Sequence, residues 1–209
     1  MTKYSKYQDY VIKNGKFIGE FEEMYRDFDD PWNQKKIEIH KEEKKICLEF
    51  IKNSNFKKII EFGCGLGSFT NQISRYCNNL TGIDISETAI KKAKKSYPHI
   101  KFRIGRFPDL EFLKDFNPDC ILMPEITWYV LEELDQLISF LKKEMPQTFL
   151  VHTLMVYKKE TQNYGKSSFT NLEEILSYFD MNYVDYGKFE SEDNDGSGRT
   201  FFIGRYGKI

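Results

Sequence analysis

The sequence has little of what marks membrane-spanning, metal-binding or disulfide-bonded proteins. No run approaches the roughly 18 consecutive apolar residues of a membrane span, and the N-terminus has no apolar signal core. We therefore expect a cytoplasmic protein without membrane association. Histidine occurs 3 times and cysteine 4 times, and the cysteines form no CxxC pair. This pattern favours reduced, mostly buried thiols and no metal site.

Charge of one sign is also lacking. The chain has 31 Lys and Arg against 32 Asp and Glu, a net charge of -1 at pH 7. A general nucleic-acid binder needs a basic face, so we expect none here. Hydrophobic residues make up 40% and charged residues 30% of the 209 positions, which is typical of one globular α/β domain. Aromatic residues make up 16%, which indicates a ring-rich core or a pocket lined with rings.

Short apolar segments alternate with amphipathic ones along most of the chain. Strands are expected at 57–62, 80–84, 100–104, 120–123 and 148–152. Helices are expected at 68–77, at 86–97 with Ser86 as N-cap, and at 131–145. This alternation predicts a doubly wound, mostly parallel sheet.

The two ends of the chain differ from this pattern. Segments 183–189 and 200–206 are strand-like and are joined by a polar stretch, so they predict a hairpin with an antiparallel last strand. At the N-terminus, helices are expected at 20–25 and 38–51. We interpret residues 1–55 as a helical lid on a cofactor-binding core of residues 56–209, together forming a single domain, 1–209.

A glycine-rich segment lies between the first expected strand and the helix that follows it. Gly63, Gly65 and Gly67 allow a tight turn and a close approach to a ligand. The dinucleotide fingerprint would place its third glycine at position 68, which is Ser68, so a nicotinamide-dependent dehydrogenase is disfavoured. Glu61, just before the loop, is placed where it could hold a ligand's ammonium group.

An acidic residue ends the next expected strand. Asp84 follows Gly63 by 21 residues, and a carboxylate there can accept both hydroxyls of a ribose. A ligand with an amino-acid end near the glycines and a nucleoside end near Asp84 fits S-adenosylmethionine.

These segments, Glu61 to Gly67 and Gly82 to Ser86, resemble those of class I S-adenosylmethionine-dependent methyltransferases. The resemblance implies a seven-stranded Rossmann-like sheet with helices on both faces and a reversed last strand. It also implies in-line methyl transfer with S-adenosyl-L-homocysteine as product, and it places Ile85 with Asp84 in the cofactor site. The element Asp30-Pro31-Trp32 is similar to that of nodulation-type N-methyltransferases, which methylate an amine on a sugar. By that resemblance the N-terminal segment folds over the cofactor with Trp32 facing it, although Trp32 could equally be a packing anchor.

Further candidates follow the later strands, where ligands of open α/β sheets bind. Arg106 stands where the family usually has an acid that meets the adenine, so Arg106 and Phe107 are expected at the nucleobase. Glu125 is the first choice for a general base or an acceptor-orienting group at the sulfonium, and His152 is a second candidate base. The expected substrate-binding side chains are Trp128, Tyr129 and Tyr157. For each of these, a purely structural role is the alternative.

The sequence thus predicts methyl transfer to an O or N atom of a small polar acceptor. A sugar, a nucleotide-linked sugar, or a phosphorylated or phosphoramidate metabolite of surface-polysaccharide biosynthesis would fit. The alternative is a catalytically silent cofactor-binding or regulatory module of the same fold. Neither DNA nor protein methylation is indicated, and a monomer or a homodimer is expected.

Overall fold

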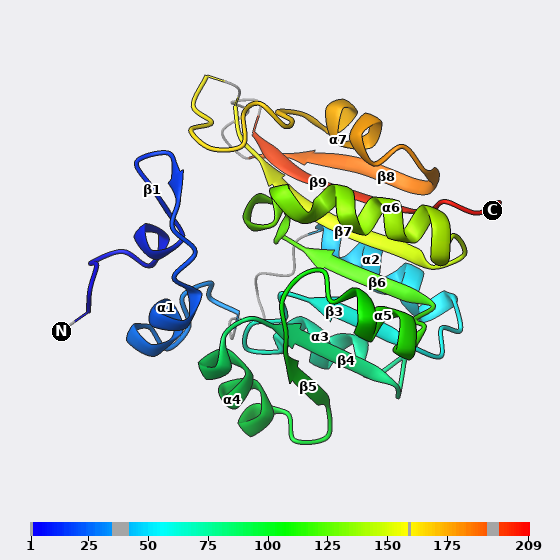
Figure 1. The fold of residues 1–209 in the computed structure, drawn as a ribbon, viewed down its shortest axis with the longest axis horizontal. Coiled ribbons are helices and arrows are strands. Elements are labelled where there is room, and N and C mark those ends of the chain that lie inside the picture. The colour runs from blue at the N-terminus through cyan, green and yellow to red at the C-terminus, as the bar shows by residue number, and fades with distance from the viewer. Residues whose placement is uncertain (1, 35–41, 159, 192–196) are drawn as a thin grey trace.

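A seven-stranded sheet forms the centre of the computed structural model, which describes residues 2–34, 42–158, 160–191 and 197–209 (Figure 1). Its strand order is β5-β4-β3-β6-β7-β9-β8. The bounds are β3 Ile59–Phe62, β4 Leu80–Asp84, β5 Lys101–Ile104, β6 Cys120–Pro124, β7 Phe149–Val156, β8 Asn182–Glu190 and β9 Gly198–Arg205. All seven strands were expected from the sequence.

The direction of the strands also agrees with the prediction. Strands β3 to β7 pair in parallel, whereas β9 runs antiparallel to both β7 and β8. Every residue of β3 and β4 is buried, because helices cover both faces of the sheet at its centre. The fold is therefore the Rossmann-like arrangement with a reversed last strand.

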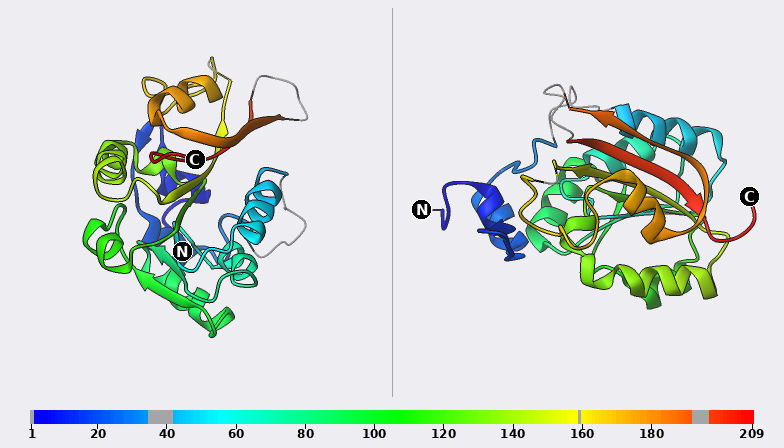
Figure 2. Two further views of the ribbon diagram at one scale, coloured as in Figure 1. Left: turned by 90° about the vertical axis from the view of Figure 1, so that its right-hand side faces the viewer. Right: turned by 90° about the horizontal axis from the view of Figure 1, so that it is seen from above.

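Helices cover both faces of the sheet (Figure 2). On one face, α2 and α3 pack on β3, β6 and β9, and α4 packs on β5 through Ile90, Ala93 and Phe102. On the other face, α5, α6 and α7 share one large apolar cluster. The bounds are α2 Glu42–Asn53, α3 Ser68–Ile73, α4 Glu87–Ser96, α5 Leu110–Phe116, α6 Leu134–Glu144 and α7 Leu172–Phe179.

Local capping explains where several helices begin. The Ser86 side chain accepts a hydrogen bond from the Ala89 amide at 3.1 Å, as its expected N-cap role requires. Asp109 and Asn171 cap α5 and α7 in the same way. These two short helices were not expected from the sequence. Helix α6 begins at Leu134 rather than 131, because a 3-10 turn, Leu131–Glu133, precedes it.

Residues 2–34 form a separate small layer, which we call the lid segment. It contains a 3-10 helix (Tyr7–Tyr10), a hairpin of β1 (Ile12–Lys13) and β2 (Lys16–Phe17), and helix α1 (Phe21–Asp27). Its own apolar cluster packs on Leu66 of the glycine loop and on Ala89 of α4. In Figure 1 it lies beside the sheet, far from the C-terminus.

Polar contacts fasten the lid segment to α4. Glu22 of α1 accepts hydrogen bonds from the Ser86 hydroxyl at 2.7 Å and from the Thr88 hydroxyl at 2.6 Å. These contacts lower the pKa of Glu22, although burial opposes the change. Lys92 donates to the carbonyls of Tyr25 and Phe28 at the end of α1, which satisfies the helix's free carbonyl groups.

Helix α2 corrects the expected extent of the lid. The sequence assigned residues 1–55 to it, but α2 packs on the sheet through Cys47 and Ile51, which lie four residues apart on one face. Residues 38–41 of the helix expected at 38–51 lie outside the described residues. Helix α2 thus belongs to the layer that covers the sheet, and its Lys44 also reaches the carboxyl ends of the strands.

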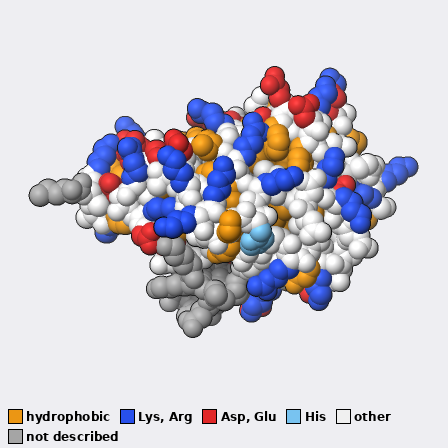
Figure 3. Space-filling model, turned by 90° about the horizontal axis from the view of Figure 1, so that it is seen from below, with side chains coloured by type: hydrophobic (Ala, Val, Ile, Leu, Met, Phe, Trp, Pro, Cys, Tyr) orange, Lys and Arg blue, Asp and Glu red, His pale blue; other side chains and the backbone are white. Residues whose placement is uncertain are grey.

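Within the described residues, no helix is long and apolar enough to cross a membrane. The same residues contain no group of three or more side chains suited to hold a metal ion. All four cysteines are free and buried, as expected. On the face drawn in Figure 3, Lys and Arg side chains alternate with acidic and apolar ones.

Candidate functional site

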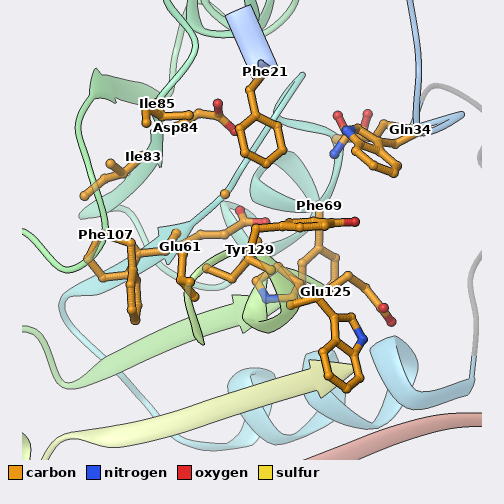
Figure 4. Close-up of a pocket in the computed structure, with 18 of the residues that line it drawn as sticks. Phe21, Gln34, Glu61, Phe69, Ile83, Asp84, Ile85, Phe107, Glu125 and Tyr129 are labelled. Atoms are coloured by element: carbon orange, nitrogen blue, oxygen red, sulfur yellow. The ribbon is translucent and has the colours of Figure 1, made fainter. Parts of the chain in front are cut away.

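A cavity of about 980 Å³ opens beyond the carboxyl ends of the parallel strands, beneath the lid segment. In Figure 4, Asp84, Ile85 and Phe107 lie toward one end of it and Glu125 toward the other, with Tyr129 between them. The structure brings together most of the side chains singled out in the sequence. Those that line the cavity are Trp32, Glu61, Gly63, Asp84, Ile85, Arg106, Phe107, Glu125, Trp128, Tyr129 and Tyr157.

The glycine loop turns sharply between β3 and α3. Gly63, Gly65 and Gly67 have φ values of +67°, +54° and +80°, a region that side chains disfavour. A Cβ on Gly63 would lie 2.2 Å from Ile126 Cγ2, so no larger residue fits there. Gly63 lines the cavity, whereas Gly65 and Gly67 shape the loop without lining it.

Asp84, the last residue of β4, holds the glycine loop through hydrogen bonds. Its two carboxylate oxygens accept hydrogen bonds from the amides of Gly65 at 2.8 Å and Ser86 at 2.9 Å. Burial raises the pKa of Asp84 to about 6, although these amide hydrogen bonds oppose the rise. Because each carboxylate oxygen can accept a second hydrogen bond, the side chain retains acceptor capacity toward the cavity. It fits a pair of ribose hydroxyls.

Glu61 is a buried carboxyl group that the protein leaves incompletely satisfied. It is 1% exposed, and its Oε2 has no hydrogen-bond partner among the described residues. Burial raises the pKa of Glu61 to about 7. An unpaired carboxylate in a cavity is costly unless a cation joins it. The side chain therefore fits the ammonium group of an amino-acid ligand.

The nucleobase end of the cavity is apolar. Ile85 is half exposed at the end of β4, and Phe107 packs edge-to-face on Phe62 with 5.2 Å between the ring centroids. Arg106 is exposed and also lines the cavity. Together with Asp84 and Glu61, these residues fit S-adenosylmethionine, with its adenine, ribose and ammonium groups placed in that order.

Glu125 occupies the opposite end, directly after β6. Its backbone has a φ of +62°, and its amide donates to the Thr153 carbonyl at 2.8 Å. Carboxylate oxygen Oε2 accepts from the Met155 amide at 2.9 Å, whereas Oε1 has no hydrogen-bond partner among the described residues. The neighbouring strand therefore holds one oxygen, whereas the other is buried without a hydrogen-bond partner, 3.6 Å from Arg199 Nη1.

Aromatic rings surround this end. Trp128 donates its indole N–H to the Met155 carbonyl at 2.8 Å, and Tyr157 is 48% exposed. Tyr129 contacts three rings of the lid segment, so rings of the lid form part of the cavity wall. The three are Phe17, Phe21 and Trp32.

His152, the second candidate base, does not reach the cavity. It is fully buried in β7, and its ring stacks on Phe202 with 4.5 Å between centroids. Its Nε2 lies 2.6 Å from the Thr127 hydroxyl. Burial lowers the pKa of His152 to about 3, so the ring stays neutral at physiological pH. The structure therefore favours a packing role over the catalytic role expected for it, because His152 lies in the middle of β7, where both faces of the strand are buried, and does not line the cavity.

The sequence did not single out several residues that complete the site. Gln34 accepts a hydrogen bond from the Leu66 amide at 2.6 Å and lies over Gly65. Arg199 reaches the cavity from β9, and Lys44 from α2. Only the packing of the lid, of β9 and of α2 on the sheet brings them here, and nothing local in their segments signals it. The Asn14-Gly15 turn of the lid hairpin was a local signal that could have been used.

Comparison with known proteins agrees with this geometry. Residues 59–143 match the model of a family described as a methyltransferase domain. The chain is 27% identical over 120 residues, 55% of its length, to phosphoethanolamine N-methyltransferase 3 of Arabidopsis thaliana. It is 36% identical over 59 residues, 27% of its length, to the putative methyltransferase 235L of Invertebrate iridescent virus 6. It spans only 24% and 22% of the lengths of these two relatives.

Among solved structures, the fold resembles that of the N-methyltransferase NodS from Bradyrhizobium japonicum WM9 in complex with S-adenosyl-l-homocysteine. The TM-score is 0.65 with 19% identity, covering 87% of this chain and 94% of that one. Residues 59–143 therefore resemble a methyltransferase domain, and the fold resembles that of class I S-adenosylmethionine-dependent methyltransferases. The comparisons support S-adenosylmethionine as the cofactor.

Proposed function

We propose that this chain, whose residues 59–143 resemble a methyltransferase domain, transfers a methyl group from S-adenosylmethionine to an N or O atom of a small polar acceptor. When bound, the cofactor supplies a methyl group on a positively charged sulfur. The residues of the chain then have to hold the acceptor in line and exclude water. The lid segment and the rings around Tyr129 serve the second purpose, since they cover the cavity.

The observation that carries the proposal is the carboxylate oxygen Oε1 of Glu125, which is buried at the cavity and has no hydrogen-bond partner among the described residues. It lies in the same cavity as Asp84 and Glu61, which fit the cofactor, but at the other end. A carboxylate oxygen there can accept a hydrogen bond from an acceptor N–H or O–H and take up its proton. The nearby rings suit a positively charged group, which favours an amine over an alcohol.

The acceptor we propose is an amine-bearing sugar or a phosphorylated amine. The volume of the cavity leaves room for a compact metabolite beside the cofactor, and the names of two relatives contain N-methyltransferase. A nucleotide-linked or phosphoramidate metabolite of surface-polysaccharide biosynthesis belongs to the same chemical range. The near-zero net charge supports an enzyme that acts without nucleic acid, and we propose that it works in the cytoplasm as a monomer or a homodimer.

The test is product formation. Purified protein with S-adenosylmethionine is offered phosphoethanolamine, glucosamine or glycerol 3-phosphate, and S-adenosylhomocysteine is measured by mass spectrometry. We expect release with at least one amine, and a Glu125→Gln variant that loses turnover but keeps cofactor affinity. Tight cofactor binding without turnover on any small metabolite would favour the alternative, a silent cofactor-binding module. Its support is Arg106, which replaces the usual acid.

A further inference from the structure

Three charged side chains from different elements meet beneath the acceptor end of the cavity. Arg199 Nη1 of β9 lies 3.6 Å from Glu125 Oε1 and 3.9 Å from Glu43 Oε1, in the first turn of α2. Arg199 and Glu125 line the cavity, whereas Glu43 is 0% exposed behind them. One guanidinium group is thus shared by two carboxylates.

The topology of the sheet explains why Arg199, Glu125 and Glu43 lie close together. Arg199 pairs with Met155 across the antiparallel strands β7 and β9, so the two residues lie side by side. The Met155 amide donates to Glu125 Oε2, which places Glu125 next to Arg199. Helix α2 packs on the same face of the sheet and brings Glu43 to the guanidinium from the other side.

The cluster is incompletely hydrogen-bonded. Neither carboxylate oxygen of Glu43 has a hydrogen-bond partner among the described residues, and the same holds for Glu125 Oε1. Both distances to Arg199 exceed that of an ordinary hydrogen bond, so the guanidinium group is hydrogen-bonded to neither carboxylate. A buried carboxylate without hydrogen bonds costs free energy, and such groups in a folded protein call for an explanation.

We propose that Glu43 is a positioning residue for the acceptor, acting by competition for Arg199. By sharing the guanidinium, Glu43 keeps Arg199 from donating a hydrogen bond to Glu125 Oε1, so that this oxygen can accept one from an N–H of the acceptor. Without the charge of Glu43, Arg199 would close on Glu125 in a charge-assisted pair and cover that oxygen. The inference rests on the proposed function, because it assumes that the acceptor binds at Glu125.

The charge balance also points to the kind of acceptor. Two carboxyl groups share one guanidinium and neither is hydrogen-bonded to it, so the carboxyl group at the cavity is only partly neutralised and can take a cation. Burial raises the pKa of Glu43, and Arg199 and Lys44 oppose that rise. Because burial raises the pKa of Glu43, the test is made near pH 8.5. The acceptor class is therefore an amine that reaches the site as an ammonium ion and passes its proton to Glu125 before methylation.

Ethanolamine and ethylene glycol are a matched pair of probes, since they are similar in size and differ in charge. The only two tryptophans of the chain, Trp32 and Trp128, both line the cavity, so tryptophan fluorescence reports binding. In protein saturated with S-adenosylhomocysteine, we expect Glu43→Gln to raise the Kd of ethanolamine about tenfold, the effect of losing one charge-assisted contact. Glu43→Asp, which keeps the charge, should restore most of the affinity, and the affinity for the uncharged ethylene glycol should change less than that for ethanolamine.

For a second variant, the inference predicts no loss of affinity for ethanolamine. Arg199→Met removes the shared cation and leaves Glu125 Oε1 open, so ethanolamine should bind at least as tightly as to the wild type. A merely structural role for the cluster predicts weaker binding in both variants, and that result would overturn the inference. Wild-type protein that binds S-adenosylhomocysteine but not ethanolamine would overturn it as well. Failure of the wild type to bind S-adenosylhomocysteine would instead refute the proposed function.

Discussion

Replacing Glu61 by Gln should raise the stability of the protein without ligand and weaken its binding of the cofactor product. Burial raises the pKa of Glu61 from an ordinary 4.5 to about 7. Between these pH values the folded protein holds a proton that the unfolded chain has released, so the contribution of Glu61 to stability is lost as pH rises through 7. A shift of this size corresponds to about 3 kcal/mol, since one pKa unit is worth about 1.4 kcal/mol.

Glu61→Gln is neutral at every pH and is close in shape to the protonated side chain. The free energy of unfolding of the variant, relative to that of the wild type, should therefore increase by about 3 kcal/mol between pH 4 and pH 8. Urea denaturation at a series of pH values without ligand measures this difference. Glu111→Gln, at an exposed position of α5, is the matched control and should show no such change.

The same substitution should harm ligand binding. Glu61→Gln removes the charge that fits the ammonium group, so the affinity for S-adenosylhomocysteine should fall about tenfold or more at pH 8. The variant is thus expected to be more stable without ligand and to bind more weakly. Unfolding free energies that change in parallel with pH for variant and wild type would refute the idea that Glu61 is a costly buried carboxyl group kept for a ligand.

Three further substitutions test other parts of the site. Asp84→Ala should raise the Kd of S-adenosylhomocysteine about tenfold to a hundredfold in calorimetry, because two hydroxyl hydrogen bonds to a carboxylate are lost; near-normal affinity would contradict the ribose assignment. Gly63→Ala should cost about 2 kcal/mol or more and lower the Tm by several degrees, because its Cβ would collide with Ile126; an unchanged Tm would show that the loop can relax. His152→Gln should remove a loss of stability that the wild type shows as pH falls from 6.5 toward 3, since the buried ring cannot take the proton that the unfolded chain binds, and its turnover should keep the wild-type pH profile.

Local sequence patterns predicted the parts of the fold that depend on short segments. The buried runs of β3 and β4 and the Ser86 cap were visible because burial on both faces and N-capping leave a local signature. The glycine spacing located the loop because three positive φ angles in a few residues require glycine. Short helices such as α5 and α7 span about two turns, too few to show a helical period clearly.

Tertiary packing determined what the sequence could not show. Whether the His152 side chain reaches the cavity depends on how β7 packs in the sheet. Because β7 is apolar and buried on both faces, its sequence does not indicate where the His152 side chain lies. Glu43 and Arg199 are 156 positions apart and meet only because helix α2 packs on the sheet next to strand β9. The packing of α2 on the sheet was likewise not visible in its own segment, which we interpreted as part of the lid.

The central claim is that the cavity binds S-adenosylmethionine and its product. Isothermal titration calorimetry of the wild-type protein with S-adenosylhomocysteine, and with NAD as a control, tests it most directly. The structure predicts one molecule of S-adenosylhomocysteine bound per chain and no measurable binding of NAD, since Asp84, Glu61 and the glycine loop fit the first ligand. Binding of NAD alone, or of neither ligand, would contradict the assignment of the cavity.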